Sequence, residues 1–391
     1  MKAVIIAAVD WILSYMRQRE AEMIALIRRF VECESPSDDP VAVNRFVELV
    51  SDTLTPLADI RAHNGGRFGK HLVCKMRLPG KKKSGRILAL GHSDTVWCMG
   101  TLGSMPFRHA GGRLWGPGVY DMKAGIVFFI FAVLALRELQ IPVPSGVLLQ
   151  LNSDEEVGSD SSRPLTEKNA AASHAVLVLE PGTGLTGKLK TARKGVGSFT
   201  VVVRGRAAHA GLDYAAGASA VVELARQIER IAALTRLRSG ITVNPGVVSG
   251  GTRSNVVAAE ARVEVDMRVL HSRDALVLEK RLRALRPFDK RCSIEITGGL
   301  NRPPMERSPG TVRLFHLARK AAAELGVELE ESLSGGGSDG NFTAALGIPT
   351  LDGLGAVGEG AHALNESIHI DRMADRAALL AKLLASIPPP E

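Results

Sequence analysis

Aromatic residues are scarce in this chain of 391 residues, and Phe, Trp and Tyr together make up only 4%. The basic residues that give a net charge of +8 are scattered and have no aromatics between them, so a nucleic-acid-binding surface is not expected. The dense basic run GKKKSG, residues 80–85, lies between two expected strands and is interpreted as an exposed hairpin tip rather than a phosphate-binding patch. The positive charge favours small anionic substrates instead.

Cysteine is also rare, with four residues and no C-x-x-C pair: Cys33, Cys74, Cys98 and Cys292. Such irregular spacing argues against a disulfide framework and against a structural zinc site. A reducing compartment is therefore expected, and we predict a cytoplasmic protein.

No apolar run is long enough to predict a membrane span. The run GIVFFIFAVLAL, residues 125–136, is too short to cross a bilayer and predicts a buried helix. The amino-terminal KAVIIAAVDWIL begins like a signal peptide, but Asp10 interrupts it and no small-residue cleavage pattern follows. We interpret it as the start of an amphipathic helix that reaches toward Cys33, and no membrane partner is expected.

What the chain does contain is alternating strand-like and helix-like segments, with 45% apolar and 23% charged residues. Strands are expected in HLVCKMRL, GRILALGHSD, GVLLQLNSD and HAVLVLEPG, and helices at residues 40–55, 125–139 and 163–172. This order predicts an α/β domain whose largely parallel or mixed sheet is covered on both faces. Ligands of such sheets bind outside the carboxyl ends of the strands.

Between Gly195 and Gly298 the pattern changes to β-α-β-β-α-β, the split ferredoxin-like unit. After it the α/β pattern resumes, with a helix expected at residues 309–324. The chain therefore predicts a second domain inserted into the first. We place the boundaries at residues 1–193 for the first catalytic segment, 194–300 for the inserted domain and 301–391 for the second catalytic segment.

Acidic and imidazole groups gather where the expected strands end. They are His92 and Asp94 in GHSD, Asp154–Glu156 in NSDEE, Glu180 in LEPG, Asp121 in the turn GPGVYDMKAG and His362 in the loop GEGAHALNE. Carboxylates packed this closely must either take up protons or hold a cation. Mixed imidazole and carboxylate ligands suit zinc or a similar divalent ion, and the set is large enough for two ions that share a carboxylate.

Two further features bear on this site. Neighbours on extended chain point in different directions, so Glu155 can face the substrate as a base while Glu156 binds metal. The Gly-rich SGGGSDGN, residues 334–341, lacks the G-K-[ST] ending of a phosphate loop and predicts a close backbone approach near the site instead.

Taken together and in order along the chain, these motifs resemble the dinuclear zinc exopeptidase family. The matching segments are GHSDTV, GPGVYDMKAG, NSDEEVGS, LEPG, RGRAAHAG, SNVVAAE with VDMR, GGGSDG and GAHALNE. The family includes glutamate carboxypeptidases of the carboxypeptidase G type, aminoacylases and succinyl-diaminopimelate desuccinylases. It implies an α/β catalytic domain with a mixed sheet and an inserted ferredoxin-like dimerisation and lid domain.

The resemblance implies two divalent metal ions per subunit, which we expect to be zinc. Asp121 would bridge them, with His92 and Glu180 completing one position and Glu156 and His362 the other.

Three catalytic roles follow from the same resemblance. Asp94 would hydrogen-bond His92 from behind, and Glu155 would be the general base that passes a proton from the attacking water to the leaving amine. His209 in RAAHAG would reach the active site of a neighbouring subunit and stabilise the tetrahedral oxyanion, which makes a homodimer part of the mechanism.

For specificity, Asn255 and Arg268 would bind the free carboxylate of the substrate, and Lys188 and Arg302 occupy places similar to residues that face glutamate in the carboxypeptidase G type. Ordinary surface charge is the alternative for the last two.

We therefore expect a metallo-carboxypeptidase that releases glutamate from a small-molecule or short-peptide substrate with a free carboxylate. The alternative within the fold is an N-acyl-amino-acid deacylase or a dipeptidase. A non-catalytic metal or nucleic-acid binder is a third reading, but such a protein has no use for a base at Glu155.

Overall fold

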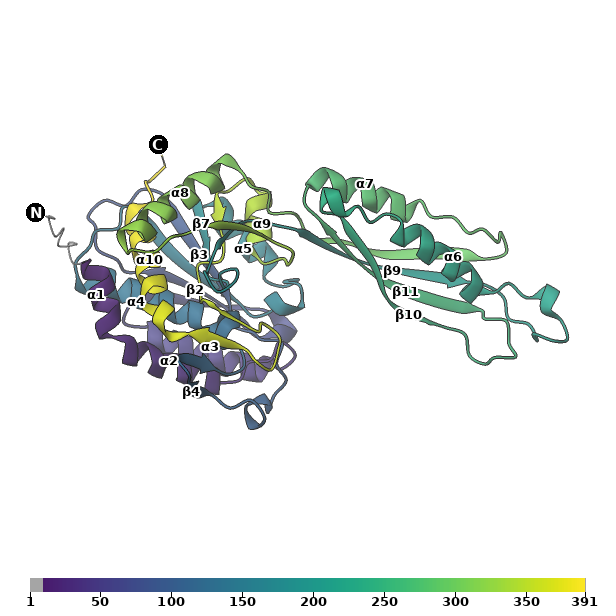
Figure 1. Ribbon diagram of the computed structural model, residues 1–391, viewed down its shortest axis with the longest axis horizontal. Coiled ribbons are helices and arrows are strands. Elements are labelled where there is room, and N and C mark those ends of the chain that lie inside the picture. Colours follow the sequence, from purple (N-terminus) through teal and green to yellow (C-terminus); the bar gives the residue numbers. More distant parts are fainter. Residues whose placement is uncertain (1–9, 391) are drawn as a thin grey trace, which may run out of the picture. The chain divides into compact units, whose positions relative to one another are not determined.

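The computed structural model describes residues 10–390 (Figure 1). The part of the predicted amino-terminal helix that precedes Asp10 lies outside these described residues. Contacts divide the chain into two compact units, which are described separately. The first holds the described residues up to Ala192, Arg307–Leu333 and those from Ser338 onward, and the second holds Arg193–Glu306 with Ser334–Gly337.

A six-stranded mixed sheet forms the centre of the first unit. Its order is β1 (Ala58–Asn64), β2 (Lys70–Met76), β6 (Gly146–Asn152), β3 (Arg86–His92), β7 (Ala175–Val178) and β14 (Thr350–Leu351). The strands β6, β3, β7 and β14 run parallel, whereas β2 is antiparallel to β6 and β1 to β2. The predicted mixed sheet is thereby confirmed.

One local prediction about this sheet is wrong. The run at residues 80–85 is not a hairpin tip, because β6 lies between β2 and β3 and the two strands do not pair. The run is a connecting loop, and its three lysines, Lys81, Lys82 and Lys83, are exposed as expected.

Helices cover both faces of the sheet, because residues alternate in direction along each strand. Ile87 and Ala89 of β3 point into the larger core, whereas Leu88 and Leu90 point into the smaller one. The larger core is built with α1 (Trp11–Gln18), α2 (Glu20–Glu32), α3 (Pro40–Leu54), α4 (Ala124–Glu138), α8 (Pro309–Glu324) and α10 (Met373–Ser386). The smaller core is covered by α5 (Arg163–Ala171), against which α9 (Gly340–Ala345) packs.

The apolar run around residue 130 forms α4, a helix buried on nearly all sides. With the preceding turn it makes a helical stretch, Val119–Glu138, that is long and apolar enough to cross a membrane by length and composition. However, 89% of an 18-residue apolar window within that stretch is buried inside the protein, where the helix packs against α10, α2 and α1. It is the central core helix of the first unit.

The expected amphipathic helix toward Cys33 is two helices, α1 and α2. Arg19 separates them because its backbone leaves the helical region, with φ −106° and ψ 16°. Its guanidinium pairs with Glu22 on α2 and with Glu138 at the end of α4.

Two small sheets were not predicted from the sequence. One contains β4 (Arg108–Ala110), β5 (Arg113–Trp115), β15 (Gly358–Glu359) and β16 (Ser367–His369), and the other pairs β8 (Leu189–Arg193) with β13 (Glu331–Ser334). Because β16 pairs with β5, residues that follow His362 are fixed beside the segment that leads to Asp121.

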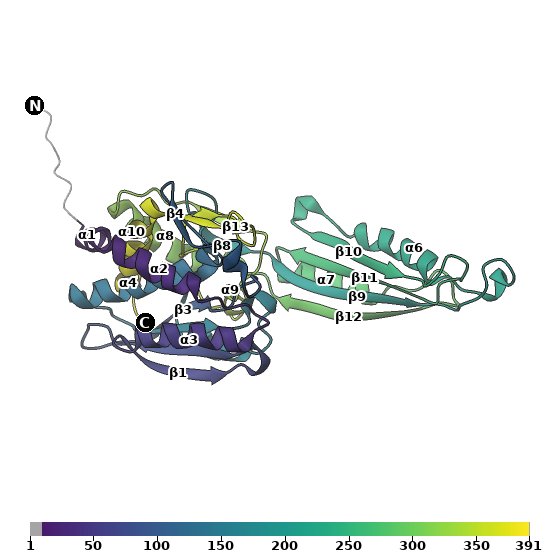
Figure 2. The ribbon, with the colours of Figure 1, turned by 90° about the horizontal axis from the view of Figure 1, so that it is seen from below.

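The second unit has the predicted β-α-β-β-α-β order: β9 (Gly195–Arg204), α6 (Ala220–Ala232), β10 (Thr242–Gly250), β11 (Glu260–Val269), α7 (Ser272–Arg283) and β12 (Ser293–Arg302). Its antiparallel sheet has the order β10-β11-β9-β12 (Figure 2). Phe199, Val201 and Val203 alternate into its core, which the two helices complete. This is the ferredoxin-like arrangement inferred from the sequence.

Candidate metal centre

Three neighbouring strands end at the same edge of the large sheet. His92 is the last residue of β3 and is paired in register with Asn152, the last residue of β6. On the other side of β3, Leu90 is paired with Val178 at the end of β7. The acidic residues that directly follow β6 and β7 are therefore carried past the same edge as His92.

The first group of possible metal ligands is His92, Asp121 and Glu180. The Nε2 atom of His92 lies 3.2 Å from Asp121 Oδ1 and 3.5 Å from Glu180 Oε1. Its Nδ1 atom lies 2.9 Å from the main-chain carbonyl oxygen of Asp94, which can only accept a hydrogen bond. In a neutral imidazole the proton is then on Nδ1, and Nε2 directs its lone pair at the two carboxylates.

The second group is Asp121, Glu156 and His362. The Nε2 atom of His362 lies 3.5 Å from Asp121 Oδ2 and 3.3 Å from Glu156 Oε2. Asp121 thus directs one oxygen into each group and is the residue they share. The structure brings together all five ligands expected from the sequence.

The spacing of these donor atoms fits two small divalent cations. Ligands about 2.1 Å from a tetrahedral ion lie about 3.4 Å from one another, and the four contacts above span 3.2–3.5 Å. Glu156 Oε1 is also buried without a hydrogen-bond partner, which is costly for a carboxylate oxygen unless a cation is near. The imidazole and carboxylate donors suit zinc and related ions.

Electrostatics shift the pKa values of the same residues. Burial lowers the pKa of His92, but its hydrogen bonds to neighbouring carboxylates reverse the effect and hold that pKa well above the ordinary value. Contacts with Asp121 and Glu156 raise the pKa of His362 to about 10. Burial raises the pKa of Asp121, but the two histidines outweigh it and leave that pKa lowered. Burial raises the pKa of Glu156. The two imidazoles therefore offset part of the negative charge of the three carboxylates.

Asp94 supports the site in a different way from the one expected. Its carboxylate oxygen Oδ1 lies 3.5 Å from His92 Nδ1, farther than its own main-chain carbonyl. The carboxylate accepts hydrogen bonds from Ser37 Oγ at 2.8 Å and from the backbone N–H groups of Glu155 and Glu156 at 3.2 Å. Asp94 thus orients both the histidine and the turn that carries the expected base.

The Gly-rich segment at residues 334–341 reaches the same end of β6. Asp339 accepts hydrogen bonds from Asn152 Nδ2 and Ser159 Oγ, so it fixes the loop on which Glu155 and Glu156 lie. A Cβ atom at Gly340 would come within 2.9 Å of Val178 at the end of β7. The predicted close backbone approach therefore occurs, at Gly340.

Two supporting residues were missed in the sequence. Ser37, the donor to Asp94, lies outside every recognised motif. Glu366 is fully buried and bonds to the loop of Asp121, and its position in the quoted segment GEGAHALNE, four residues after His362, was a signal that went unused.

In the second unit, the predicted substrate residues lie at two ends of the sheet. His209 forms a bridge with Val256, and Ala210 N donates to Asn255 O at 2.9 Å, so His209 and Asn255 are neighbours beyond the end where Arg204 is paired with Glu260.

At the other end of that sheet, Arg268 on β11 and Arg302 on β12 are both paired with Val196, on either side of β9. The eight residue steps from Glu260 to Arg268 correspond to about 27 Å of strand. His209 and Asn255 therefore cannot meet Arg268 and Arg302 within one copy of this unit.

Two of the predicted cations are already paired. Lys188 Nζ lies 2.8 Å from Glu330 Oε2, and Arg268 Nε lies 2.9 Å from Asp266 Oδ1. Arg302 is buried, with 5% of its surface exposed.

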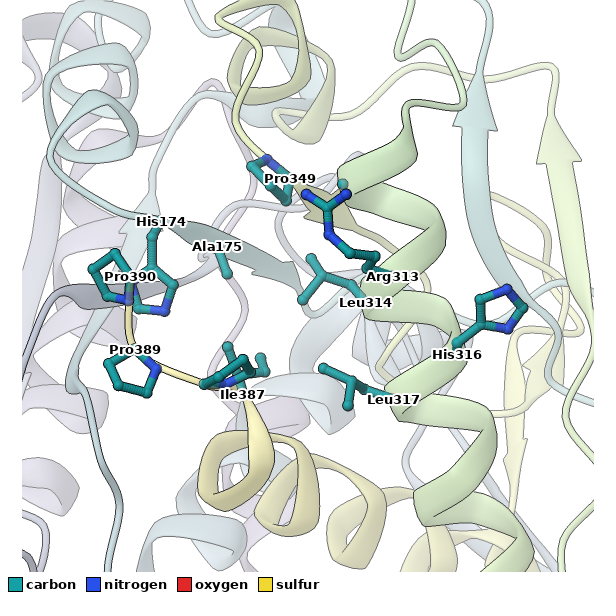
Figure 3. Close-up of a pocket in the computed structure, with 12 residues that line it drawn as sticks. His174, Ala175, Arg313, Leu314, His316, Leu317, Pro349, Ile387, Pro389 and Pro390 are labelled. Atoms are coloured by element: carbon teal, nitrogen blue, oxygen red, sulfur yellow. The ribbon is translucent and has the colours of Figure 1, made fainter.

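A separate cavity of about 620 Å³ lies at the opposite edge of the large sheet (Figure 3). Ala175, the first residue of β7, and Pro349, just before β14, line it together with Leu314, Leu317 and Ile387. The metal ligands follow the other ends of the strands, and none of the described residues that line the cavity is acidic. This cavity is not part of the candidate metal centre.

Known proteins share this fold and much of this sequence order. The chain is 27% identical to carboxypeptidase G2 of Pseudomonas sp. (strain RS-16) over 377 aligned residues. The alignment covers 93% of this chain and 89% of that protein. The aminopeptidase PepT of Bacillus cereus superposes with a TM-score of 0.79 at 22% identity, over 94% of this chain and 98% of that one. The YXEP protein of Bacillus subtilis, described as a dinuclear metal binding peptidase, superposes with a TM-score of 0.69 at 14% identity, over 94% and 98%.

The family model described as peptidase family M20/M25/M40 matches residues 88–386. This range includes every expected metal ligand and the whole second unit, and it confirms the resemblance and the fold class predicted from the motifs. The chain therefore belongs to peptidase family M20/M25/M40 and is an enzyme of the metallopeptidase type.

Proposed function

We propose that this metallopeptidase hydrolyses the last amide or peptide bond of N-acyl or short peptidyl substrates and releases glutamate. The observation that carries the proposal is the pair of ligand groups that share Asp121, with Glu155 directly beside the ligand Glu156. Its likeness to carboxypeptidase G2 along most of both chains supports a carboxypeptidase.

In this proposal two zinc ions occupy the two groups. When bound, such ions lower the pKa of water and polarise the substrate carbonyl. The protein then has to fix its ligands and move a proton. His92 keeps its Nε2 lone pair available because Nδ1 donates to the Asp94 carbonyl. Asp94 also holds the backbone N–H groups of Glu155 and Glu156, which fixes the base relative to a ligand.

Glu155 is the general base. It takes a proton from the attacking water and gives it to the nitrogen of the leaving amino acid as the amide bond breaks. The variant Glu155→Gln keeps the size and the position but cannot accept the proton. We expect normal metal content and turnover reduced on the order of a hundredfold or more. Near-normal turnover in this variant would contradict the role.

His209 is proposed to stabilise the tetrahedral oxyanion. Its Nδ1 atom accepts hydrogen bonds from Gly211 N and Leu212 N, both at 3.1 Å, so the ring proton is on Nε2. The residue is exposed, and this Nε2–H group is free to donate to a developing negative charge.

The separation of residues in the second unit supports a homodimer. His209 and Asn255 lie about 27 Å of strand away from Arg268, so all three can contact one small substrate only if two copies of the chain contribute. Mixing His209→Ala with Glu155→Gln should restore activity, because a hybrid dimer then contains one intact site. No recovery after demonstrated subunit exchange would exclude a shared site.

Glutamate specificity is assigned to Arg268, Arg302 and Lys188, with Asn255 on the terminal carboxylate. A guanidinium can bind a carboxylate with two hydrogen bonds. Lys188 must exchange Glu330 for the substrate and Arg268 must exchange Asp266, so we expect Lys188→Ala and Arg268→Ala each to raise KM for substrates that end in Glu.

The test is amine release by the zinc-loaded enzyme from matched N-acyl and peptidyl substrates that end in Glu, Asp, Leu or Lys. Strong preference for Glu supports the glutamate carboxypeptidase, and the same substrates with an amidated carboxyl end serve as the control for carboxylate recognition. Equal rates on all four would refute glutamate specificity.

A second candidate is an N-acyl-amino-acid deacylase or dipeptidase with the same metal chemistry. The observation that favours it is that Lys188 and Arg268 are already neutralised by carboxylates of their own chain, Glu330 and Asp266. Hydrolysis of short acyl groups or dipeptides, without preference for a terminal Glu, would identify it.

We also infer a cytoplasmic location. All four cysteines are free, and Cys74 and Cys292 are buried, as in proteins of reducing compartments. Labelling of the intact cells with a membrane-impermeant thiol reagent would leave the protein unmodified if this is correct.

A further inference from the structure

Glu366 joins two loops of the metal centre through a single side chain. It is fully buried, and both of its carboxylate oxygens accept two hydrogen bonds. Oε1 accepts from Tyr120 N at 2.8 Å and from Asp121 N at 3.0 Å. Oε2 accepts from Gly118 N at 2.8 Å and from Trp97 Nε1 at 2.7 Å.

Three of the four donors are backbone N–H groups of the turn that carries Asp121, the ligand shared by both groups. Glu366 itself lies four residues after His362, and its backbone N–H bonds to Ala363 O at 2.9 Å within the same loop. Strand β16 begins at the next residue and pairs with β5, which fixes the base of this loop. The side chain therefore crosses from the loop of one ligand to the turn of another.

We propose that Glu366 is a positioning residue that sets the separation of Asp121 and His362 and thereby completes the Asp121, Glu156 and His362 metal position. This inference rests on the proposed dinuclear centre. No role in binding the ion itself is assigned to Glu366, because both of its oxygens are occupied by N–H donors.

The arrangement requires a carboxylate. All four partners are donors, and only a group with two acceptor oxygens can satisfy them. In Glu366→Gln the amide NH₂ must face two of the N–H groups, whichever way the amide is turned. In Glu366→Asp the charge remains, but the side chain is one methylene shorter and cannot keep all four contacts.

The metal position that Asp121 and His362 share is sensitive to the loss of these contacts, because Asp121 Oδ2 and His362 Nε2 lie only 3.5 Å apart. A shift of about 1 Å in one ligand already moves it outside the spread of about 0.2 Å that metal bonds accept. The other position shares Asp121, but its remaining ligands, His92 and Glu180, stand at the ends of β3 and β7, whereas His362 lies on the same loop as Glu366. Loss of Glu366 should therefore weaken one metal position more than the other.

The experiment is a titration of the metal-free full-length protein with cobalt(II), followed by visible absorption and by metal analysis after gel filtration. We expect wild type to bind two ions, and Glu366→Gln to bind the second at least tenfold more weakly. Raising the cobalt concentration should restore turnover in this variant, which a general loss of folded protein would not allow.

Glu223→Gln is the matched control. Glu223 is equally buried, and it also accepts backbone N–H groups, from Phe288 and Asp289, but in the second unit. This variant should bind both ions as wild type does. If Glu366→Gln does not fold, Trp97→Phe removes one donor while keeping an aromatic ring, and a smaller loss of the second ion is expected.

Wild-type affinity for both ions in Glu366→Gln, or in Trp97→Phe where the first variant does not fold, would overturn the role of Glu366 while leaving the metal centre intact. A wild-type protein that bound no cobalt would overturn the proposed metal centre itself.

Discussion

Loading the metal centre at pH 7 should release about two protons per subunit. A histidine must be neutral to bind a metal. In the metal-free protein, His362 has a pKa of about 10 and the pKa of His92 lies well above its ordinary value, so both are protonated at pH 7. Each must lose its proton when an ion takes the place between it and its carboxylates.

The raised pKa of His362 makes both the metal affinity and the folding stability depend on pH. Each released proton makes the apparent metal affinity rise about tenfold per pH unit, and for His362 this continues until the pH reaches about 10. In the metal-free protein the same raised pKa of His362 makes the folding stability fall as the pH rises. Its contribution to stability is fully present below the ordinary value of 6.5 and is lost as the pH rises through about 10.

The assay is calorimetric titration of the metal-free protein with zinc in buffers of different ionisation enthalpy, which gives the number of protons released. His362→Ala should reduce that number to about one, because only the His92 proton remains to be displaced. Release of less than one proton by wild type at pH 7 would refute the assignment of two imidazolium ions to the empty centre.

Three further changes test the scaffold. Phe129→Ala empties a fully buried ring position of α4 and should lower the free energy of unfolding by about 3–5 kcal/mol in urea titrations; a cost below about 1 kcal/mol would contradict the packing. Gly355→Ala puts a methyl group 2.2 Å from the Leu179 carbonyl, beside a ligand, and should weaken zinc binding in a competition titration, whereas Gly103→Ala, with nothing within 4 Å, should not. Arg376→Met leaves three buried glycine carbonyls without their donor and should lower Tm by several degrees; an unchanged Tm would show that these bonds are dispensable.

Local patterns predicted most of the elements, because their signals are contained in short stretches of chain. The helix expected at residues 309–324 matches α8 at both ends, since Ser308 accepts from Thr311 N at its start and Pro309 favours the first turn. The hairpin expected around residues 80–85 was wrong because strand order depends on a partner, β6, that lies some sixty residues further along the chain.

The metal ligands could also be predicted from local patterns, whereas the residues that position them could not. The carboxyl ends of neighbouring parallel strands lie at the same edge of a sheet. The positions of His92, which ends β3, and Glu180, which follows β7, could therefore be predicted. The place of Glu366 four residues after His362 made it a candidate, but its hydrogen bonds to a distant turn could not be predicted from local sequence. The same holds for the hydrogen bonds of the Asp94 carboxylate with Glu155 and Glu156. The distance between His209 and Arg268 could not be predicted either, because it depends on the register of the strands, which composition does not encode.

The ligands are held by strand ends and hydrogen-bonded loops, so the fold around them should not depend on the metal. Asp121 has a histidine on each side, and its two oxygens face the nitrogen atoms that metal ions would join to it. The carboxylate oxygens lie 3.2–3.5 Å from the histidine nitrogens, on strand ends and loops that the sheet and its hydrogen bonds fix. Exchange of two protons for two dications then adds two positive charges without requiring the strand ends to move. Metal removal should accordingly abolish turnover while leaving the far-ultraviolet circular dichroism unchanged, and a loss of helix signal on chelation would show that the metal, rather than the protons and the sheet, holds these ligands together.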